Sequence, residues 1–451
     1  MKILRLFAAL LLIPAGLGTT AVAAAENLTT PEQLLPQLDA ILKQAIAQSP
    51  RMIGRAVDLE MAENDRIAAR ANLLPSVAGS YSYTEAEEDR ADLNGSSRVT
   101  KIAYNFSVSQ PLYYWGERRN SDKKGAIRLS MAQGQYREGY RLFAQEVRNQ
   151  YMRLILGKLR TTRTAYYRDF TANQAKLGEE RLAKKVISDA QIFAIRMDAE
   201  KAQIGAERAS FDYENDKASF ARLTGTPQLK DGEIPDSIPP VTPQTESVQS
   251  VLAGFLAQKN PPALEAVNYL HLLEIERLGL ANQKTRLKPK LNFVLGASQD
   301  QQSYTVNIAQ KYQVKSLFAG VSGSWTIFDG FSTGAAVRSA QAKVRQMEKD
   351  YRGLTERLAE QAQSQARLIG FSARYISINE RYLSSSGGSM TTRKEEFARG
   401  VISEEAVSTA QLGLYDAEIT AYTSRADYYA QVGEFLGTVM EDPVLHNLAS
   451  K

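Results

Sequence analysis

The feature that most constrains the fold of this 451-residue chain is an internal repeat with an offset of about 214 residues. Pro75 and Pro289 each follow a helical stretch and open an alternating one, and they lie 214 residues apart. Gly116 and Gly330 close the alternating stretches at the same offset. Two further matches follow in the same order, Val186-Ile187-Ser188 with Val401-Ile402-Ser403 and Leu223-Thr224-Gly225-Thr226 with Phe435-Leu436-Gly437-Thr438. Four ordered matches at a nearly fixed offset indicate two copies of one structural unit.

The repeat predicts how the chain is divided. Residues 231–245 hold four prolines (Pro235, Pro239, Pro240 and Pro243) and are typical of a linker. We therefore expect a first repeat over residues 26–230, a second over residues 246–440 and a C-terminal tail over residues 441–451.

Residues 1–25 are predicted to be a cleaved secretory signal. Lys2 and Arg5 precede an apolar run that ends near Leu17, and small residues at Ala21 to Ala25 offer a cleavage site. The run is shorter than the roughly 20 apolar residues of a membrane-spanning helix. Without Lys2 and Arg5 the formal charge falls from +5 to +3, which is too mild to indicate nucleic-acid binding.

The composition excludes several kinds of site. The chain has no cysteine, so it has no disulfide, no thiol nucleophile, no thiolate metal site and no lipidated cysteine. Its two histidines, His271 and His446, are too far apart to suggest a metal centre or a catalytic triad. Residues 320–323 loosely match a nucleophile elbow, but they lack its spacing and lie in an alternating stretch. We therefore predict no enzymatic activity and no cofactor or metal.

Each repeat is predicted to begin with a broken helix followed by two strands. The helices cover residues 31–72 and 246–287, and prolines interrupt them near Ser49-Pro50 and at residues 260–262. Large apolar and small polar residues then alternate with the period of a half-buried strand. The predicted strands are residues 76–86, 101–113, 290–299 and 314–328, and an acidic loop with an Asn94-Gly95 turn joins the first two.

Four strands in two hairpins cannot close a stable sheet alone. A water-soluble sandwich would show the same alternation, but the rest of the chain lacks strand signal. If three chains each supply four strands, the sum is twelve, an even number of the kind that bacterial outer-membrane barrels have. Small polar side chains would then face a watery lumen, and tyrosines and phenylalanines would face lipid.

The rest of each repeat is predicted to be a long helical hairpin, at residues 117–223 and 331–436. No proline occurs between Gly116 and Val186 or between Gly330 and Val401. Apolar residues recur at spacings of three and four, which is typical of a coiled-coil seam. They are Tyr136, Tyr140, Phe143, Val147, Tyr151 and Leu154 in the first repeat, and Val337, Ala340, Val344, Met347, Tyr351, Leu354 and Leu358 in the second. A helix of roughly 65 residues reaches about 100 Å.

Three motifs in this order of elements carry a resemblance to a known family. They are Ser109-Gln110-Pro111-Leu112 with Gly116, Phe328-Asp329-Gly330, and Phe397 to Ser403, which is similar to a Y-x-x-G-x-x-S/T turn. The chain resembles the TolC family of outer-membrane efflux and type I secretion proteins over nearly its whole length. The implied fold is mixed α and β: a trimeric outer-membrane β-barrel that continues into a coiled-coil α-helical barrel in the periplasm of a Gram-negative bacterium.

The resemblance also implies partners and site residues. The partners are two further copies, outer-membrane lipid, a periplasmic adaptor (membrane fusion) protein, and an inner-membrane ABC or proton-driven transporter; no cofactor and no nucleic acid are expected. Strand-to-helix turns fall at Pro111, Gly116, Asp329 and Gly330. Hairpin tips that contact the adaptor fall at Val186, Ile187, Ser188, Gly400, Val401 and Ser403.

The periplasmic aperture is where the sequence departs from the family. The aperture candidates are Gln191, Phe397, Ile402, Ala406 and Thr409, with Asp189, Glu404 and Glu405 nearby. Gln191, Ala406 and Thr409 stand where the family has ring-forming aspartates, so the usual acidic ring is absent. The three nearby acids either replace that ring or only favour the start of a helix through its dipole.

Other functions remain as alternatives. The export duct serves type I protein secretion, drug efflux or both, and a duct for small molecules alone is one alternative. A periplasmic coiled-coil adaptor would have one helical hairpin, whereas two are predicted here. A purely structural coiled coil would leave the four amphipathic strands unexplained.

Overall fold

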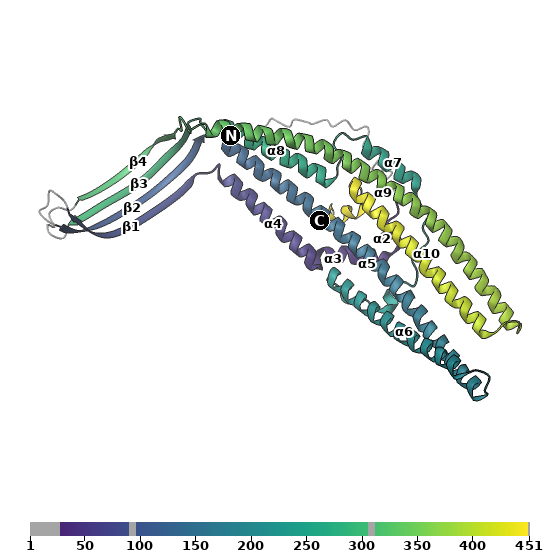
Figure 1. The fold of residues 1–451 in the computed structure, drawn as a ribbon. Helices are drawn as coiled ribbons and strands as arrows, with labels where there is room; N and C mark the ends of the chain where they lie inside the picture. Colours follow the sequence, from purple (N-terminus) through teal and green to yellow (C-terminus); the bar gives the residue numbers. More distant parts are fainter. Residues whose placement is uncertain (1–27, 90–95, 305–311, 450–451) are drawn as a thin grey trace, which may run out of the picture. The chain divides into compact units, whose positions relative to one another are not determined.

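The computed structural model describes residues 28–89, 96–304 and 312–449 (Figure 1). The predicted signal segment and the predicted Asn94-Gly95 turn lie outside these residues. Within the described ranges, no helix combines the length and the apolar character that a membrane-spanning helix needs.

The chain forms two compact units. The first, here called the helical unit, comprises the described parts of Met1–Val57, Gln135–Val267 and Gly353–Lys451. The second, here called the sheet unit, comprises the described parts of Asp58–Gly134 and Asn268–Arg352. Both repeats contribute to both units, because each long helix begins in the sheet unit and ends in the helical unit.

The sheet unit contains one antiparallel four-stranded sheet in the order β1-β2-β3-β4 (Figure 1). Its strands are β1 (Ser76–Asp89), β2 (Ser96–Tyr113), β3 (Lys290–Tyr304) and β4 (Tyr312–Ser324). β1, β2 and β3 extend further toward their connecting loops than the alternation predicts. β4 ends four residues earlier than predicted, where the Trp325 indole turns to donate a hydrogen bond to the Leu287 carbonyl at 2.8 Å.

Helices from both repeats complete the sheet unit. They are the later part of α4 (Pro50–Ala71), most of α8 (Leu264–Lys284), and the first turns of α5 (Glu117–Ala183) and α9 (Ser332–Ala398). Polar pairs join them: Arg66 donates to Asp122 at 2.7 Å, and Lys343 donates to Glu276 at 2.6 Å. Asn120 donates to Asn282 at 2.7 Å, which links α5 of the first repeat to α8 of the second.

The helical unit holds the core of the molecule. Its shorter elements are α2 (Pro31–Leu34), α3 (Pro36–Gln48), α7 (Thr245–Leu256), α11 (His446–Ala449) and the 3-10 turns η1 (Asp231–Glu233) and η3 (Pro443–Leu445). They pack beside α5, α6 (Asp189–Thr224), α9 and α10 (Glu404–Val439). Fully or almost fully buried side chains come from five elements: Leu38, Phe143, Phe220, Val251 and Phe435.

The two helical hairpins have matched lengths. α5 and α9 each contain 67 residues, and α6 and α10 each contain 36. The predicted seam residues are buried where the helices enter the helical unit, as at Tyr151 and Leu154 in α5 and Leu358 in α9. The apolar periodicity therefore identifies the packed stripe of both long helices.

Candidate functional site

The sheet has one apolar and one polar face. On the apolar face, the register aligns Tyr81, Tyr104, Gln299 and Lys315 in one row across all four strands. The next aligned row of that face is Gly79, Phe106, Ala297 and Leu317, and the one after it is Val77, Val108, Leu295 and Ala319. Leu317 is 85% exposed and Tyr81 is 62% exposed. A wide apolar surface therefore stands uncovered in the single chain.

The opposite face carries small polar side chains. One of its rows is Ser80, Asn105, Ser298 and Ser316, and the next is Ala78, Ser107, Gly296 and Phe318. Phe318 is the exception in size, and its ring lies over Gly296, where a Cβ would meet the ring at 2.5 Å. The alternation predicted from the sequence thus separates the two faces.

Both long edges of the sheet are open. β1 pairs only with β2, and β4 pairs only with β3, within the part of the chain that the structure describes. These edges are 14 and 13 residues long and carry backbone N–H and C=O groups without a strand partner in this chain. Open edges of this length are competent to pair with another chain.

The apolar face has aromatic residues at both ends. In β2, Tyr104 stands at one end and Tyr113 at the other, nine residues further along the strand. A bulge adds one residue to β2 between them, because their partners in β3, Gln299 and Leu291, are eight residues apart. At about 3.4 Å per residue the two tyrosines therefore lie about 27 Å apart along the strand. Beyond Tyr104 the strands carry charged residues such as Glu85, Glu87 and Arg98.

Both tryptophans of the chain hold the same linker at the strand-to-helix junctions. Trp115 donates its indole N–H to the Pro289 carbonyl at 2.8 Å, and Trp325 donates to the Leu287 carbonyl at 2.8 Å. Lys288 lies between Leu287 and Pro289 in the sequence, and its ammonium is 4.3 Å from the centre of a Trp115 ring. One tryptophan from each repeat therefore anchors the linker between α8 and β3.

The predicted strand-to-helix turn residues occupy these junctions. Pro111 lies at a bulge in β2, where the register shifts between Pro111 and Tyr113, and it has no N–H to pair there. Gly116 (φ 88°) and Gly330 (φ 64°) take left-handed conformations in the two turns. Asp329 begins α9 by accepting the Thr333 backbone N–H at 2.9 Å and the Thr333 hydroxyl at 2.6 Å.

The two hairpin tips share one backbone design. At the end of α5, Val186 N–H donates to the Arg181 carbonyl at 2.8 Å; at the end of α9, Val401 N–H donates to the Glu396 carbonyl at 2.9 Å. This is the Schellman motif, which needs a left-handed residue just before the valine. Gly400 supplies it with φ 72° in the second tip, but Lys185 supplies it with φ 58° in the first.

The predicted adaptor-contact residues lie in these two turns. Val186 is 68% exposed and Val401 is 70% exposed, although both are apolar. Ser188 and Ser403 begin α6 and α10, where their hydroxyls accept the N–H groups of Gln191 at 3.3 Å and Ala406 at 3.4 Å. The remaining predicted tip residues, Ile187 and Gly400, belong to the same turns.

The structure places the aperture candidates within one or two helical turns of each tip. Gln191 accepts the Ser188 backbone N–H at 2.9 Å, so its side chain closes a capping box at the start of α6. Asp189, Glu404 and Glu405 are exposed in the first turns of α6 and α10, and Thr409 donates to the Glu405 carbonyl at 2.8 Å. Phe397 is 46% exposed near the end of α9, and Ile402 and Ala406 are half-buried.

Sequence reasoning missed a second apolar stripe on α9. Five of its side chains are about half exposed or more, at alternating spacings of three and four: Leu368, Phe371, Tyr375, Ile378 and Tyr382. Beside them, a groove of about 810 Å³ between α9 and α10 is lined by residues including Ser372, Asn379 and Gln431. The signal was present in the sequence, because these five apolar residues recur at the spacing of a coiled-coil seam.

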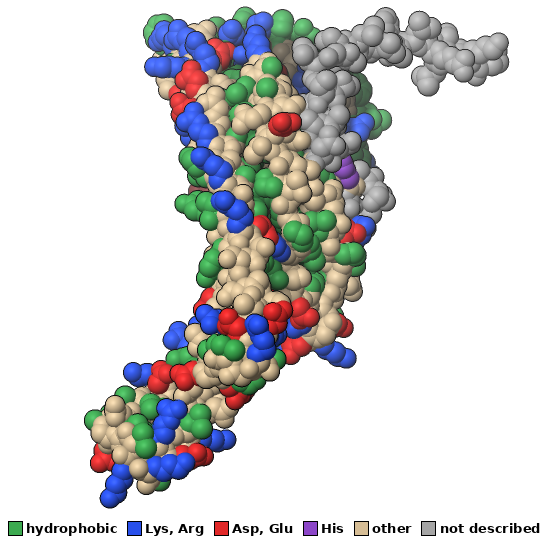
Figure 2. Space-filling view, turned by 90° about the vertical axis from the view of Figure 1, so that its right-hand side faces the viewer, with side chains coloured by type: hydrophobic (Ala, Val, Ile, Leu, Met, Phe, Trp, Pro, Cys, Tyr) green, Lys and Arg blue, Asp and Glu red, His purple; other side chains and the backbone are tan. Residues whose placement is uncertain are grey.

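Charged side chains of both signs are spread over the surface of the described chain. Figure 2 shows Lys and Arg side chains interspersed with Asp and Glu along the visible face. Among the described residues, no group of three or more histidine, cysteine, aspartate or glutamate side chains is placed to hold a metal ion.

Comparison with known proteins agrees with this architecture. A family model described as outer membrane efflux protein matches residues 41–165. No curated protein matches the chain. The solved structures that it resembles include the CmeC outer membrane channel of Campylobacter jejuni, with a TM-score of 0.69 and 12% sequence identity over 92% of this chain and 88% of that one.

Two other solved structures share the fold. The outer membrane protein VceC of Vibrio cholerae has a TM-score of 0.63 and 13% identity, over 90% of this chain and 96% of that one. The open state of the MtrE outer membrane channel of Neisseria gonorrhoeae has a TM-score of 0.62 and 12% identity, over 90% of this chain and 89% of that one. With its two helical hairpins and its open four-stranded sheet, the chain thus shares the fold of these outer membrane channels, and residues 41–165 match the outer membrane efflux protein family.

Proposed function

We propose that three copies of this chain close a twelve-stranded barrel in the outer membrane and continue it as an α-helical tunnel in the periplasm. The family consists of transport ducts and not of enzymes, and its location is the outer membrane of Gram-negative bacteria with an extension into the periplasm. The duct conducts substrates passively to the outside from an inner-membrane transporter and a periplasmic adaptor.

The observation that carries this proposal is the pair of open sheet edges beside an uncovered apolar face. Unpaired backbone groups cost several kcal/mol each in lipid, so a membrane sheet must close on itself. Pairing β4 of one copy with β1 of the next satisfies both edges at once. Three copies of the four-stranded sheet then give twelve strands, an even number as in bacterial outer-membrane barrels.

The height of the apolar face supports membrane insertion. Strands of outer-membrane barrels tilt by roughly 35–45°, so the distance of about 27 Å between Tyr104 and Tyr113 along the strand corresponds to about 21 Å across the membrane. Such barrels have an apolar band about 25 Å tall between two belts of aromatic residues. The small polar side chains of the opposite face would line the lumen.

The exposed stripe on α9 supports the helical part of the proposal. Its spacing is that of a coiled-coil seam, yet no helix of the described chain covers Phe371 or Tyr375, which are 50% and 64% exposed. In the trimer, a helix of the neighbouring copy would lie along this stripe and along the groove between α9 and α10.

The hairpin tips support docking at the periplasmic end. Exposed Val186 and Val401 occupy equivalent positions in the two tips and offer an apolar contact for the adaptor. The aperture would lie just beyond these turns, with Phe397 and Ile402 as apolar candidates and Asp189, Glu404 and Glu405 as acidic ones. Gln191 is held in its capping box, which disfavours it as a free ring-forming side chain.

Thiol cross-linking tests the closure directly, because the chain has no cysteine of its own. Ser80 of β1 is replaced by cysteine and combined in turn with cysteine at Ser316, Ser322 and Ser324 of β4, which share the polar face. A short thiol cross-linker should join these pairs into covalent dimers and trimers at one register. The matched control places cysteines at Ser107 and Ser298 in the central strands, and these should give no cross-link between chains.

The mass of the protein in detergent is measured on the same samples. A monomeric mass together with no cross-linked product at any β4 position would contradict the barrel, because four strands cannot close alone.

Two substrate classes remain for the duct, secreted polypeptides and small toxic molecules. A deletion strain separates them. Lost secretion of a large polypeptide with unchanged drug sensitivity would contradict a dedicated efflux duct. Raised drug sensitivity with normal secretion would contradict a dedicated secretion duct.

A further inference from the structure

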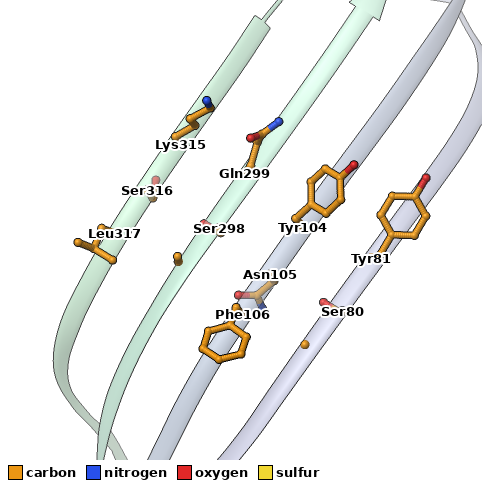
Figure 3. A pocket seen from close by; sticks show the side chains of 12 residues that line it. Ser80, Tyr81, Tyr104, Asn105, Phe106, Ser298, Gln299, Lys315, Ser316 and Leu317 are labelled. Carbon is orange, nitrogen blue, oxygen red and sulfur yellow. The ribbon is translucent and has the colours of Figure 1, made fainter.

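The apolar face of the sheet contains a depression next to its charged end. Gly79 and Ala297 are the small members of one row, and they leave a cavity of about 720 Å³ between larger side chains. Six of those side chains, from all four strands, form its walls (Figure 3): Tyr81, Tyr104, Phe106, Gln299, Lys315 and Leu317. Residues of all four strands therefore line the depression.

The two walls differ in chemistry. One wall is the row of Tyr81, Tyr104, Gln299 and Lys315, which presents phenol, amide and ammonium groups (Figure 3). The Tyr81 and Tyr104 rings support each other, with centroids 5.1 Å apart. The other wall is apolar and consists of Phe106 and Leu317, which stand in the same row as Gly79 and Ala297. A ligand that fits both walls has a hydrocarbon part and a polar part.

The positive charge of Lys315 favours a ligand whose polar part is negatively charged. The side chain is exposed on the apolar face, and no carboxylate of the described residues lies within ion-pair distance of its ammonium. A lysine on the lipid face costs roughly 2–4 kcal/mol at the middle of a bilayer but only about 0–1 kcal/mol near its surface. The row of Lys315 lies at the charged end of the apolar band, so the ammonium can reach the level of lipid head groups.

We propose that this depression binds a phosphate-bearing lipid of the outer leaflet. One acyl chain lies over Gly79 and Ala297, against Phe106 and Leu317. The lipid phosphate lies at the opposite wall, where the Lys315 ammonium and the Gln299 amide donate to it. This rests on the proposed function, because it requires the apolar face to contact lipid.

The position of the depression favours a lipid over a second copy of the chain. Copies of the chain join through the β1 and β4 edges, in the plane of the sheet, and leave the apolar face free. A trimer would carry three equivalent lipid sites.

The test uses the full chain in detergent and native mass spectrometry. The probes are lipid A with two phosphates and the same lipid A after removal of its phosphates. Lys315→Gln removes the charge and should lower the affinity for the phosphorylated probe about fivefold, with no change for the dephosphorylated one. Gly79→Leu fills the depression and should lower the affinity for both probes.

The structure provides a matched control for the glycine variant. A Cβ at Gly79 would meet only the Asn105 carbonyl oxygen, at 4.0 Å, so a side chain can be attached there without a backbone clash. A Cβ at Gly320, on the polar face of β4, would meet nothing within 4 Å. Gly320→Leu should therefore leave the affinity for both probes unchanged.

Two results would overturn the lipid site. One is wild-type protein that binds both probes equally; the other is a Lys315→Gln variant that keeps the preference for phosphate. Unchanged binding by Gly79→Leu would overturn the placement of the acyl chain. Trimer mass and bilayer conductance are recorded on the same samples, because their absence in the wild type would instead contradict the duct itself.

Discussion

Arg148 of α5 and Asp442 near the C-terminus form a two-point ion pair in the centre of the helical unit. Nη1 of Arg148 lies 2.8 Å from Oδ2 of Asp442, and Nη2 lies 3.0 Å from Oδ1. Glu32 of α2 accepts from the same guanidinium through Nε at 2.9 Å. Burial opposes the charge on Arg148, but the two carboxylates outweigh it and raise the arginine pKa. This cluster joins the two ends of the described chain to a long helix.

Asp442→Asn should destabilise the helical unit by about 3–5 kcal/mol, because it leaves a buried guanidinium without its main partner. Chemical denaturation of the full chain measures the loss, and hydrogen exchange at the end of α10 locates it. The control is Asp416→Asn in the exposed pair with Arg163, where the cost should be under about 1 kcal/mol. Equal effects of the two variants would contradict the role of burial.

Lys185→Gly should stabilise the first hairpin tip. Lys185 holds a left-handed conformation that costs a residue with a Cβ about 1–2 kcal/mol, a cost that glycine avoids. Because glycine also gains freedom in the unfolded chain, the expected net gain is about 0.5–1 kcal/mol. Hydrogen exchange at Val186 measures it as slower opening of the turn.

Gly400→Ala makes the opposite change in the second tip, because it adds a Cβ at the left-handed position. It should speed hydrogen exchange at Val401 about fivefold or more. Lys185→Ala serves as control and should change little, since alanine keeps the Cβ. A faster exchange in Lys185→Gly would refute the strain at Lys185.

The two tryptophans should report the membrane boundary. Trp115→Phe and Trp325→Phe each leave one indole, and each loses one hydrogen bond to the linker at a cost of about 1 kcal/mol. In vesicles, lipids brominated near the head group should quench the remaining fluorescence more than lipids brominated near the chain end, because tryptophan side chains favour the interface. Stronger quenching by the deep probe would contradict this placement.

Acid should loosen the linker between the two repeats. Lys217 donates to Asp231 at 2.8 Å, and this hydrogen bond holds the pKa of the Asp231 carboxyl below its usual range. The stabilisation is therefore complete above the usual aspartate pKa and is lost as the pH falls through the lowered one. Hydrogen exchange at Ile234, corrected for intrinsic rates, should rise about two- to fivefold across that window. Asp231→Asn should remove the dependence, and an unchanged profile in that variant would contradict the assignment.

Local patterns predicted most of the architecture. The offset between Pro75 and Pro289 marks two repeats, and alternation of large and small side chains separates the faces of the sheet. The positions of Gly116 and Gly330 mark the strand-to-helix turns, where the structure shows left-handed backbone. These features depend on neighbours in sequence, which is why periodicity reveals them.

Features that depend on distant residues could not be predicted. Arg148 and Asp442 are 294 residues apart, and nothing in either local sequence marks them as partners. The left-handed conformation of Lys185 is also hidden, because the equivalent position in the second repeat is the glycine that the motif prefers. The aperture is harder still, since in the proposed trimer its residues would face other copies of the chain.

The equal lengths of the paired helices have a consequence for how such a duct can change. A substitution alters one side chain, but a single inserted residue turns everything beyond it by about 100° and advances it by about 1.5 Å. An insertion in α5 alone would rotate and shift its tip relative to the equivalent tip of α9. The proposed duct can therefore be lengthened only by matched steps of whole heptads, about 10 Å each, in all four long helices at once.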